Sequence, residues 1–278
     1  MNTGWSATLI DWRQPKLWLS ILSKWIRPFL NKNGIRFLQS MGEQDICWDD
    51  PQWIKILEEV LQHEVEWPIQ YLAKDILASK VRTYHACRIE DAARYHKDGI
   101  LVNNPSLLAE KARRIVAQYG QLKYLQPIIE QKLNDFNARD CDIGKLFVVL
   151  DDRVLINEAG HYLLYGSEWM QALLGPGAYS VLRQKGVPTI FRIDMPLSLA
   201  LPGDVQQLVK ALLREWTRMK VNKANWVPEI DFTFCVGDNI SSSMVLDHFH
   251  PEAVVDPYCD YIIRRTEKQT CPTCEIKN

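Results

Sequence analysis

The sequence predicts an α+β fold in which a helical N-terminal region precedes a region of mixed strands and helices. Apolar residues at helical spacing dominate residues 1–80, whereas short β-rich runs and helical patterns intermingle after Val81. The runs lack the regular strand–helix alternation of a doubly wound parallel sheet. We therefore divide the chain into a Trp-rich helical region (1–80), an α+β domain (81–258) and a C-terminal tail (259–278).

The composition is that of an ordinary soluble globular protein, with 47% hydrophobic residues, 24% charged residues and a net charge of −1. This balance argues against bulk electrostatic binding to nucleic acid, although a local basic face is compatible with it. No apolar stretch approaches the roughly 18 residues of a membrane span. Asp11, Arg13 and Pro15 interrupt the N-terminal apolar run, so we expect no secretory signal. Seven irregularly spaced cysteines favour reduced thiols in the cytoplasm.

The N-terminal region is expected to be a separate packing unit. Pro15 suits a first helical turn, Pro28 should bend or end that helix, and further helices are expected over 51–61 and 67–79. The apolar stripe of the first helix is expected to be buried core; docking to a partner or a membrane surface is the alternative. Seven of the ten tryptophans lie here: Trp5, Trp12, Trp18, Trp25, Trp48, Trp53 and Trp67.

Elements of the α+β domain follow from local patterns. The stretch "LDDRVLIN" is interpreted as a tight hairpin around Asp151 and Asp152. The clearest helix places apolar residues on one face and Gln206, Lys210, Arg214 and Arg218 on the other. Strands are expected at 81–88, 146–150, 153–157, 161–166, 188–194, 230–236 and 243–246, and helices at 89–98, 106–118, 121–136, 168–174, 177–185 and 204–220.

Several common catalytic motifs are missing from the sequence. It contains no GxGxxG, GxxxxGK[ST], HExxH or GxSxG. These absences argue against P-loop hydrolases, ordinary Rossmann dehydrogenases, zincins and serine hydrolases.

Two stretches of the domain carry candidate site residues. In "YHACR", His85 lies on a predicted strand, where it could bond sugar hydroxyls, or instead bond a backbone carbonyl as a packed histidine. In "GHYLLYGSEWMQALLG", a predicted strand delivers Tyr165 next to a glycine turn, as a platform for a planar ring. Ser167 and Glu168 can act there simply as a helix cap and a first-turn acid.

Acids, imidazoles and thiols concentrate late in the chain. Histidines at positions i and i+2 of an extended segment share one face and could bind a metal, although polar residues around a loop-borne Pro251 need no metal. The CxxC pair near the end supplies two thiolates, which Cys259 or a histidine could complete to a zinc site. The spacing is irregular and the pair is nearly terminal, so we assign no metal ligand. The residues concerned are Asp238, Asp247, His248, His250, Glu252, Asp256, Cys271 and Cys274.

The stretches "YHACRIEDAARYHKDGI" and "HYLLYGSEWMQALLGPGAYSVL" together resemble ADP-ribosyltransferase-like domains, over about residues 81–258. The resemblance implies a split β-sheet core that binds NAD as substrate and transfers ADP-ribose to a protein or nucleic acid, or hydrolyses NAD. His85 would match the histidine that holds a ribose and Tyr165 the aromatic that stacks on nicotinamide, with Ser167 and Tyr179 in the same site. Many bacterial members are toxins or phage-defence effectors.

One departure concerns the catalytic acid. The family usually carries a glutamate on a late strand, where this sequence has "NISSSMVL". We select Glu168 because it adjoins Tyr165; Glu252 and Asp238 are alternatives. Without such an acid the domain would bind NAD and turn nothing over. A further alternative is a non-catalytic module whose Trp-rich helices bind an antitoxin-like protein partner.

Overall fold

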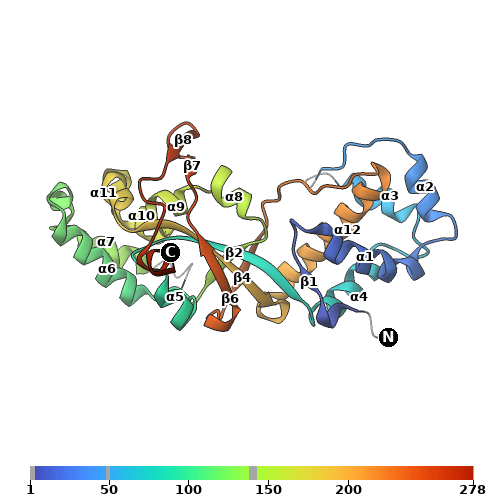
Figure 1. The fold of residues 1–278 in the computed structure, drawn as a ribbon, viewed down its shortest axis with the longest axis horizontal. Helices are drawn as coiled ribbons and strands as arrows, with labels where there is room; N and C mark the ends of the chain where they lie inside the picture. The colour runs from blue at the N-terminus through green and yellow to red at the C-terminus, as the bar shows by residue number, and fades with distance from the viewer. Residues whose placement is uncertain (1–3, 48–50, 138–142, 278) are drawn as a thin grey trace. The chain divides into compact units, whose positions relative to one another are not determined.

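The computed structural model describes residues 4–47, 51–137 and 143–277 (Figure 1). It contains both helices and strands, which confirms the α+β prediction. The chain forms two compact units. Unit 1 comprises Met1–Arg82 with Asp194–Phe234, and unit 2 comprises Thr83–Ile193 with Cys235–Asn278. Residues 194–234 thus group with the N-terminal helices rather than with the α+β region, and the tail belongs to unit 2.

Unit 1 is built around one long helix, α12 (Pro202–Val221), against which four shorter helices pack. These are α1 (Pro15–Ile26), α2 (Gly34–Ser40), α3 (Gln52–Glu58) and α4 (Glu66–Ile76). Unit 1 also holds η1 (Trp5–Ala7), η2 (Arg27–Phe29), the strand β1 (Leu9–Ile10) and η5 (Leu197–Leu199). The sequence did not predict α2.

The tryptophans of unit 1 are mainly core residues. Trp5, Trp12, Trp18 and Trp53 are buried, whereas Trp67 is 51% exposed. Indole N–H groups of Trp12 and Trp18 donate to the carbonyls of Pro228 and Asp11, so their polar atoms are satisfied inside the unit. Trp48 lies outside the described residues. Burial of these rings favours packing over partner docking for most of the set.

The polar face predicted for α12 is partly covered. Two of its four residues, Arg214 and Arg218, are buried. The guanidinium of Arg218 donates to the buried Glu215 carboxylate at 2.7 Å and to the Trp226 carbonyl at 2.6 Å. A paired charge can be buried in this way, so the helix is covered on more of its circumference than its apolar pattern indicates.

In the described residues the main sheet has six strands, namely β1 with β2 (Lys80–Ile89), β3 (Leu146–Val149), β4 (Val187–Pro196), β5 (Thr233–Val236) and β6 (Val245–Phe249). Their order is β5-β3-β2-β4-β6, and β1 pairs in parallel with β2. Neighbouring pairs β2–β3 and β4–β6 are antiparallel. A separate antiparallel pair is formed by β7 (Ala253–Asp256) and β8 (Ile262–Arg265).

Short helices lie beside the strands of unit 2 (Figure 1). Those from α6 to α11 share a core with Tyr84, Ile190 and Val254 of the strands. The helices are α5 (Ala93–Asp98), α6 (Pro105–Gln118), α7 (Ile129–Asn137), α8 (Asp152–Asn157), α9 (His161–Tyr165), α10 (Glu168–Leu174), α11 (Tyr179–Gln184) and α13 (Pro272–Lys277), with η3 (Gly120–Leu125), η4 (Pro176–Ala178) and η6 (Ser242–Met244). No helix in the described part of the chain is long and apolar enough to cross a membrane.

Two predicted strands, 153–157 and 161–166, are helices α8 and α9. The predicted hairpin at Asp151 and Asp152 is also wrong, because Asp151 accepts a hydrogen bond from the Arg153 N–H and caps α8. Short apolar runs of this kind fit either a buried strand or a buried helix. Tyr165 is therefore delivered by the end of a helix, not of a strand.

Gly160 sets the packing of α9 against β7. A Cβ at this position would lie 2.0 Å from the carbonyl oxygen of Val255, so only glycine allows the two backbones to approach. This approach brings Tyr165, at the end of α9, next to Asp256, at the end of β7.

Candidate active site

Three tyrosines from separate elements of unit 2 stack together, and we call them the tyrosine cluster. The ring centroids of Tyr165 and Tyr179 lie 4.3 Å apart. Tyr258 lies 5.9 Å from Tyr165 and 5.6 Å from Tyr179, with nearly parallel planes. Tyr165 is 4% exposed and Tyr258 is 49% exposed. The ring surface offered to a ligand is therefore mainly that of Tyr258, which the sequence did not single out.

Asp256 binds the tyrosine cluster through the hydroxyl of Tyr165. Its Oδ2 atom accepts hydrogen bonds from the Tyr165 hydroxyl at 2.6 Å and from Nε of Arg264 at 2.5 Å. Burial acts to raise the pKa of Asp256, but the bonds from Tyr165 and Arg264 hold it below the usual 3.8. Burial and the Asp256 carboxylate together raise the pKa of Tyr165. The acid is therefore ionised and the phenol neutral around pH 7.

His161 and Glu168 form an acid–histidine pair beside the cluster. The His161 ring lies 5.2 Å from that of Tyr258, and its Nε2 lies 3.5 Å from Oε1 of Glu168. Both ring nitrogens are buried, and the 3.5 Å contact of Nε2 with Glu168 has the length of an ion pair rather than of a well-formed hydrogen bond. Burial lowers the pKa of His161, against the opposing effect of Glu168. A neutral imidazole in this position can accept a proton.

The structure brings some of the predicted site residues together. Tyr165 and Tyr179 stack directly, and Glu168 reaches the cluster through His161. Ser167 caps α10 and accepts a hydrogen bond from the Met170 N–H. This capping contact is the one that the purely structural interpretation of Ser167 predicts.

His85 has a different environment, on β2 next to β3. Its Nδ1 lies 3.0 Å from the carbonyl oxygen of Phe147. Burial lowers its pKa, with the Phe147 bond acting in the opposite direction. A bond to a backbone carbonyl is what the packing interpretation of His85 predicts.

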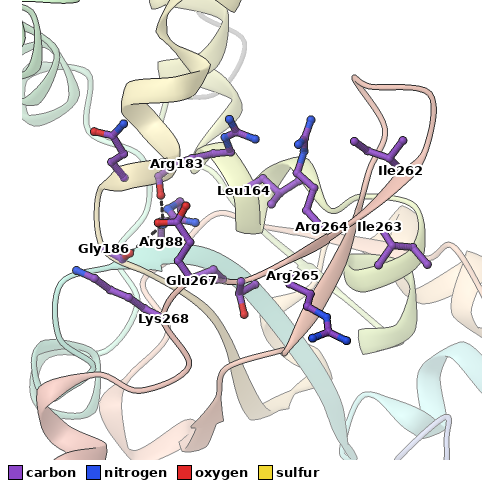
Figure 2. A pocket seen from close by; sticks show the side chains of 13 residues that line it. Arg88, Leu164, Arg183, Gly186, Ile262, Ile263, Arg264, Arg265, Glu267 and Lys268 are labelled. Atoms are coloured by element: carbon purple, nitrogen blue, oxygen red, sulfur yellow. Dashed lines mark hydrogen bonds between the residues drawn. The ribbon is translucent and has the colours of Figure 1, made fainter.

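A positively charged pocket of about 300 Å³ adjoins the cluster, and we call it the arginine pocket. Figure 2 shows Arg88 and Gly186 at one end and Ile262 and Ile263 of the β8 strand at the other. Arg264 lines this pocket and also binds Asp256, so a single side chain connects the pocket to the tyrosine cluster. The charged lining residues are Arg88, Arg183, Arg264, Arg265, Lys268 and the acid Glu267.

The guanidinium of Arg88 has a structural role in this pocket (Figure 2). It donates to four backbone carbonyls, of Leu163, Arg183, Lys185 and Gly186, at 2.5–2.9 Å. These carbonyls lie within α9, at the end of α11 and in the turn that follows α11. Arg88 therefore fixes both helices while its charge remains at the pocket.

Among the described residues, one group of histidines, cysteines and acids has the proximity that a metal ion requires. His248, His250, Cys271 and Cys274 offer ligand atoms that all lie within 4.8 Å of one another. The sequence suggested parts of this set but assigned no metal.

No protein-family model, curated protein or solved structure matches this chain.

The sequence patterns did not indicate three residues of the site, which are His161, Tyr258 and Arg264. They indicated Asp256 only as one of several acids late in the chain. His161 and Tyr165 are four residues apart and share a helix face. Interpreting 161–166 as a strand obscured that relationship. The link between Asp256 and Tyr165 spans 91 positions, so no local pattern indicates it.

Proposed function

We propose that unit 2 binds NAD and cleaves its nicotinamide–ribose bond, passing ADP-ribose to a macromolecular acceptor or to water. The observation that carries this proposal is the pair of hydrogen bonds that Asp256 Oδ2 accepts from Tyr165 and Arg264. These two bonds join an aromatic cluster to a cationic pocket. A dinucleotide has the matching parts, namely flat rings and a pyrophosphate.

Each part of the site suits one part of NAD. The exposed ring of Tyr258 offers a stacking surface for a planar base or nicotinamide. Arginines bind phosphate oxygens in pairs of hydrogen bonds, so the arginine pocket suits the pyrophosphate. Glu168 is 59% exposed at the edge of the cluster, where its carboxylate can face a ribose.

The chemistry follows from these groups. When the bond between ribose C1′ and the nicotinamide nitrogen breaks, its electron pair stays on nicotinamide and neutralises the ring. The ribose acquires oxocarbenium character, which the Glu168 carboxylate would stabilise. An acceptor hydroxyl or water then bonds to C1′ and gives up its proton to the exposed Glu168 carboxylate, from which the neutral imidazole of His161, 3.5 Å away, would take it.

The resemblance of residues 81–258 to ADP-ribosyltransferase-like domains supports the same reaction. Ser167 caps a helix and His85 bonds a backbone carbonyl, so both have structural roles. We therefore assign the contacts with NAD to His161, Glu168 and Tyr258. Such an activity would suit a bacterial toxin or phage-defence effector acting in the cytoplasm, with a protein or nucleic acid as acceptor.

The test is nicotinamide release from NAD by the purified full chain, with and without cell lysate. Glu168→Gln keeps the shape of the side chain and removes its charge, so we expect a loss of roughly 100-fold or more. Glu252→Gln changes an exposed acid outside the cluster and should leave the rate unchanged. Equal rates in wild type and Glu168→Gln would refute the assignment of the acid. NAD binding without turnover in the wild type would leave a non-catalytic binding module.

A further inference from the structure

We propose that His248, His250, Cys271 and Cys274 form a zinc site that fastens the C-terminal segment to unit 2. The site shares no residue with the tyrosine cluster or the arginine pocket, and the proposal does not depend on NAD chemistry. Cys271 is buried and the other three residues are half-buried.

Three of four distances between ligand atoms match the edges of a tetrahedral zinc centre, and the fourth, from His248 to Cys274, is shorter. The two sulfurs lie 3.9 Å apart. His248 Nε2 lies 3.1 Å from Sγ of Cys274 and 3.5 Å from Sγ of Cys271, and His250 Nε2 lies 3.5 Å from Sγ of Cys274. Zinc bonds of about 2.3 Å to sulfur and about 2.0–2.1 Å to nitrogen give edges of about 3.8 Å between sulfurs and about 3.5 Å between nitrogen and sulfur. A disulfide needs a sulfur separation of about 2.05 Å, so Cys271 and Cys274 are two separate thiols here.

Local structure presents the four ligands toward one point. His248 lies on β6 and His250 just after its end, at alternate positions that face the same side. The Cys274 N–H donates to the Cys271 carbonyl at 2.9 Å, so the first turn of α13 brings both thiols to one side. Two thiolates and two imidazoles are a ligand set that zinc prefers.

In both histidines Nε2 faces the sulfurs, and the other ring nitrogen, Nδ1, is the outer one. The contacts of these outer nitrogens support this orientation. His250 Nδ1 lies 2.9 Å from the Pro188 carbonyl, which can only accept a hydrogen bond, and 3.0 Å from the Thr189 hydroxyl, which donates its own proton to the Val187 carbonyl. Both contacts favour a proton on Nδ1 of the neutral ring, which leaves a lone pair on Nε2 toward Cys274. His248 Nδ1 lies 2.8 Å from Nε2 of His96 on α5. Metal-binding histidines characteristically use the outer nitrogen in such a bond.

Four protein ligands leave no open position, which is typical of a structural zinc rather than a catalytic one. The centre would connect the end of β6 to α13. A second contact supports this attachment, because Asp91 accepts hydrogen bonds from the N–H and hydroxyl of Thr273 at 3.0 and 2.5 Å. The C-terminal segment would therefore be held by the metal and by Asp91 together.

The experiment measures metal in the full chain, purified under reducing conditions from cells supplied with zinc. We expect one zinc ion per chain in the wild type and its loss in Cys274→Ser. Cys259→Ser changes an exposed cysteine of the same unit and should retain the full zinc content. Equal zinc in wild type and Cys274→Ser would overturn the proposal, as would wild-type protein that neither contains nor takes up zinc.

A second measurement does not depend on the folding of a variant. Wild-type protein is stripped with a chelator and loaded with Co²⁺. A tetrahedral site with two thiolates should give intense d–d bands and a thiolate-to-cobalt charge-transfer band, both abolished by added zinc. The apo form should also lose its C-terminal segment faster to protease than the zinc form. A cobalt spectrum of six-coordinate oxygen ligation, without the charge-transfer band, would overturn the assignment.

Discussion

Tyr165 and Arg264 donate hydrogen bonds to the same carboxylate oxygen, Oδ2 of the fully buried Asp256. A phenol on a helix and a guanidinium on a strand are thereby fixed relative to each other. Removing the carboxylate charge should loosen both the stacking surface and the charged pocket.

We expect Asp256→Asn to lower the free energy of unfolding by about 2–4 kcal/mol, because Arg264 loses its ionic partner and the Tyr165 bond weakens. Tyr165→Phe, which removes one hydrogen bond, should cost about 1–2 kcal/mol. Urea unfolding measures both. Tyr261→Phe, at a residue 66% exposed, is the matched control and should change little. An Asp256→Asn variant as stable as wild type would show that the shared bond does not hold the site.

Gly160→Ala tests the approach of α9 to β7. The backbone of Gly160 suits any residue, with φ of −61°, so the effect arises from the clash with the Val255 carbonyl. We expect a destabilisation of about 2–4 kcal/mol in thermal or urea unfolding. Gly120→Ala, in the same unit with open space around the added Cβ, should stay within about 0.5 kcal/mol. Equal stability of the two variants would contradict the close packing.

Arg88→Met should destabilise unit 2 by about 2–4 kcal/mol, because the four carbonyls that Arg88 serves lose their donors. Arg88→Lys keeps the charge but cannot reach four acceptors, so it should recover only part of the loss. Arg265→Met removes an exposed charge of the same pocket and should cost under about 0.5 kcal/mol. Full rescue by lysine would show that charge matters here and the fixed geometry does not.

The stability of the protein should depend on pH through His161 and His85. Burial lowers the pKa of both below the usual 6.5, so the unfolded chain binds protons more readily than the folded chain. The associated stability is present above pH 6.5 and is lost as the pH falls below that value. We expect a smaller difference between urea midpoints at pH 7.5 and 5.5 in His161→Gln than in wild type. An unchanged difference would contradict the burial of a neutral His161.

The sequence predicted elements with strong local signals. α10 has Ser167 as a cap and begins and ends where expected, β2 follows a clear β-rich run, and α12 shows a long helical period. Such signals are local and therefore readable. α8 and α9 are short buried helices whose apolar runs also fit strands, so they were assigned incorrectly.

The candidate sites depend on contacts between distant positions. Glu168 was selected because it lies three positions from Tyr165, which is a local relationship. The bond from Tyr165 to Asp256 instead depends on how α9 meets β7. The four proposed zinc ligands also depend on a contact between distant positions. Each pair of ligands is visible in the sequence, but His248 and Cys274 lie 26 positions apart and only the fold joins them.

The most direct test of the proposed function is nicotinamide release from NAD by the full chain, compared between wild type, Tyr258→Ala and Tyr261→Ala. Both tyrosines are exposed, but only Tyr258 belongs to the tyrosine cluster. We expect turnover in the wild type and in Tyr261→Ala and a loss of at least about 10-fold in Tyr258→Ala, with weaker NAD binding. Absence of both NAD binding and turnover in the wild type, or equal rates in all three proteins, would contradict NAD chemistry at this site.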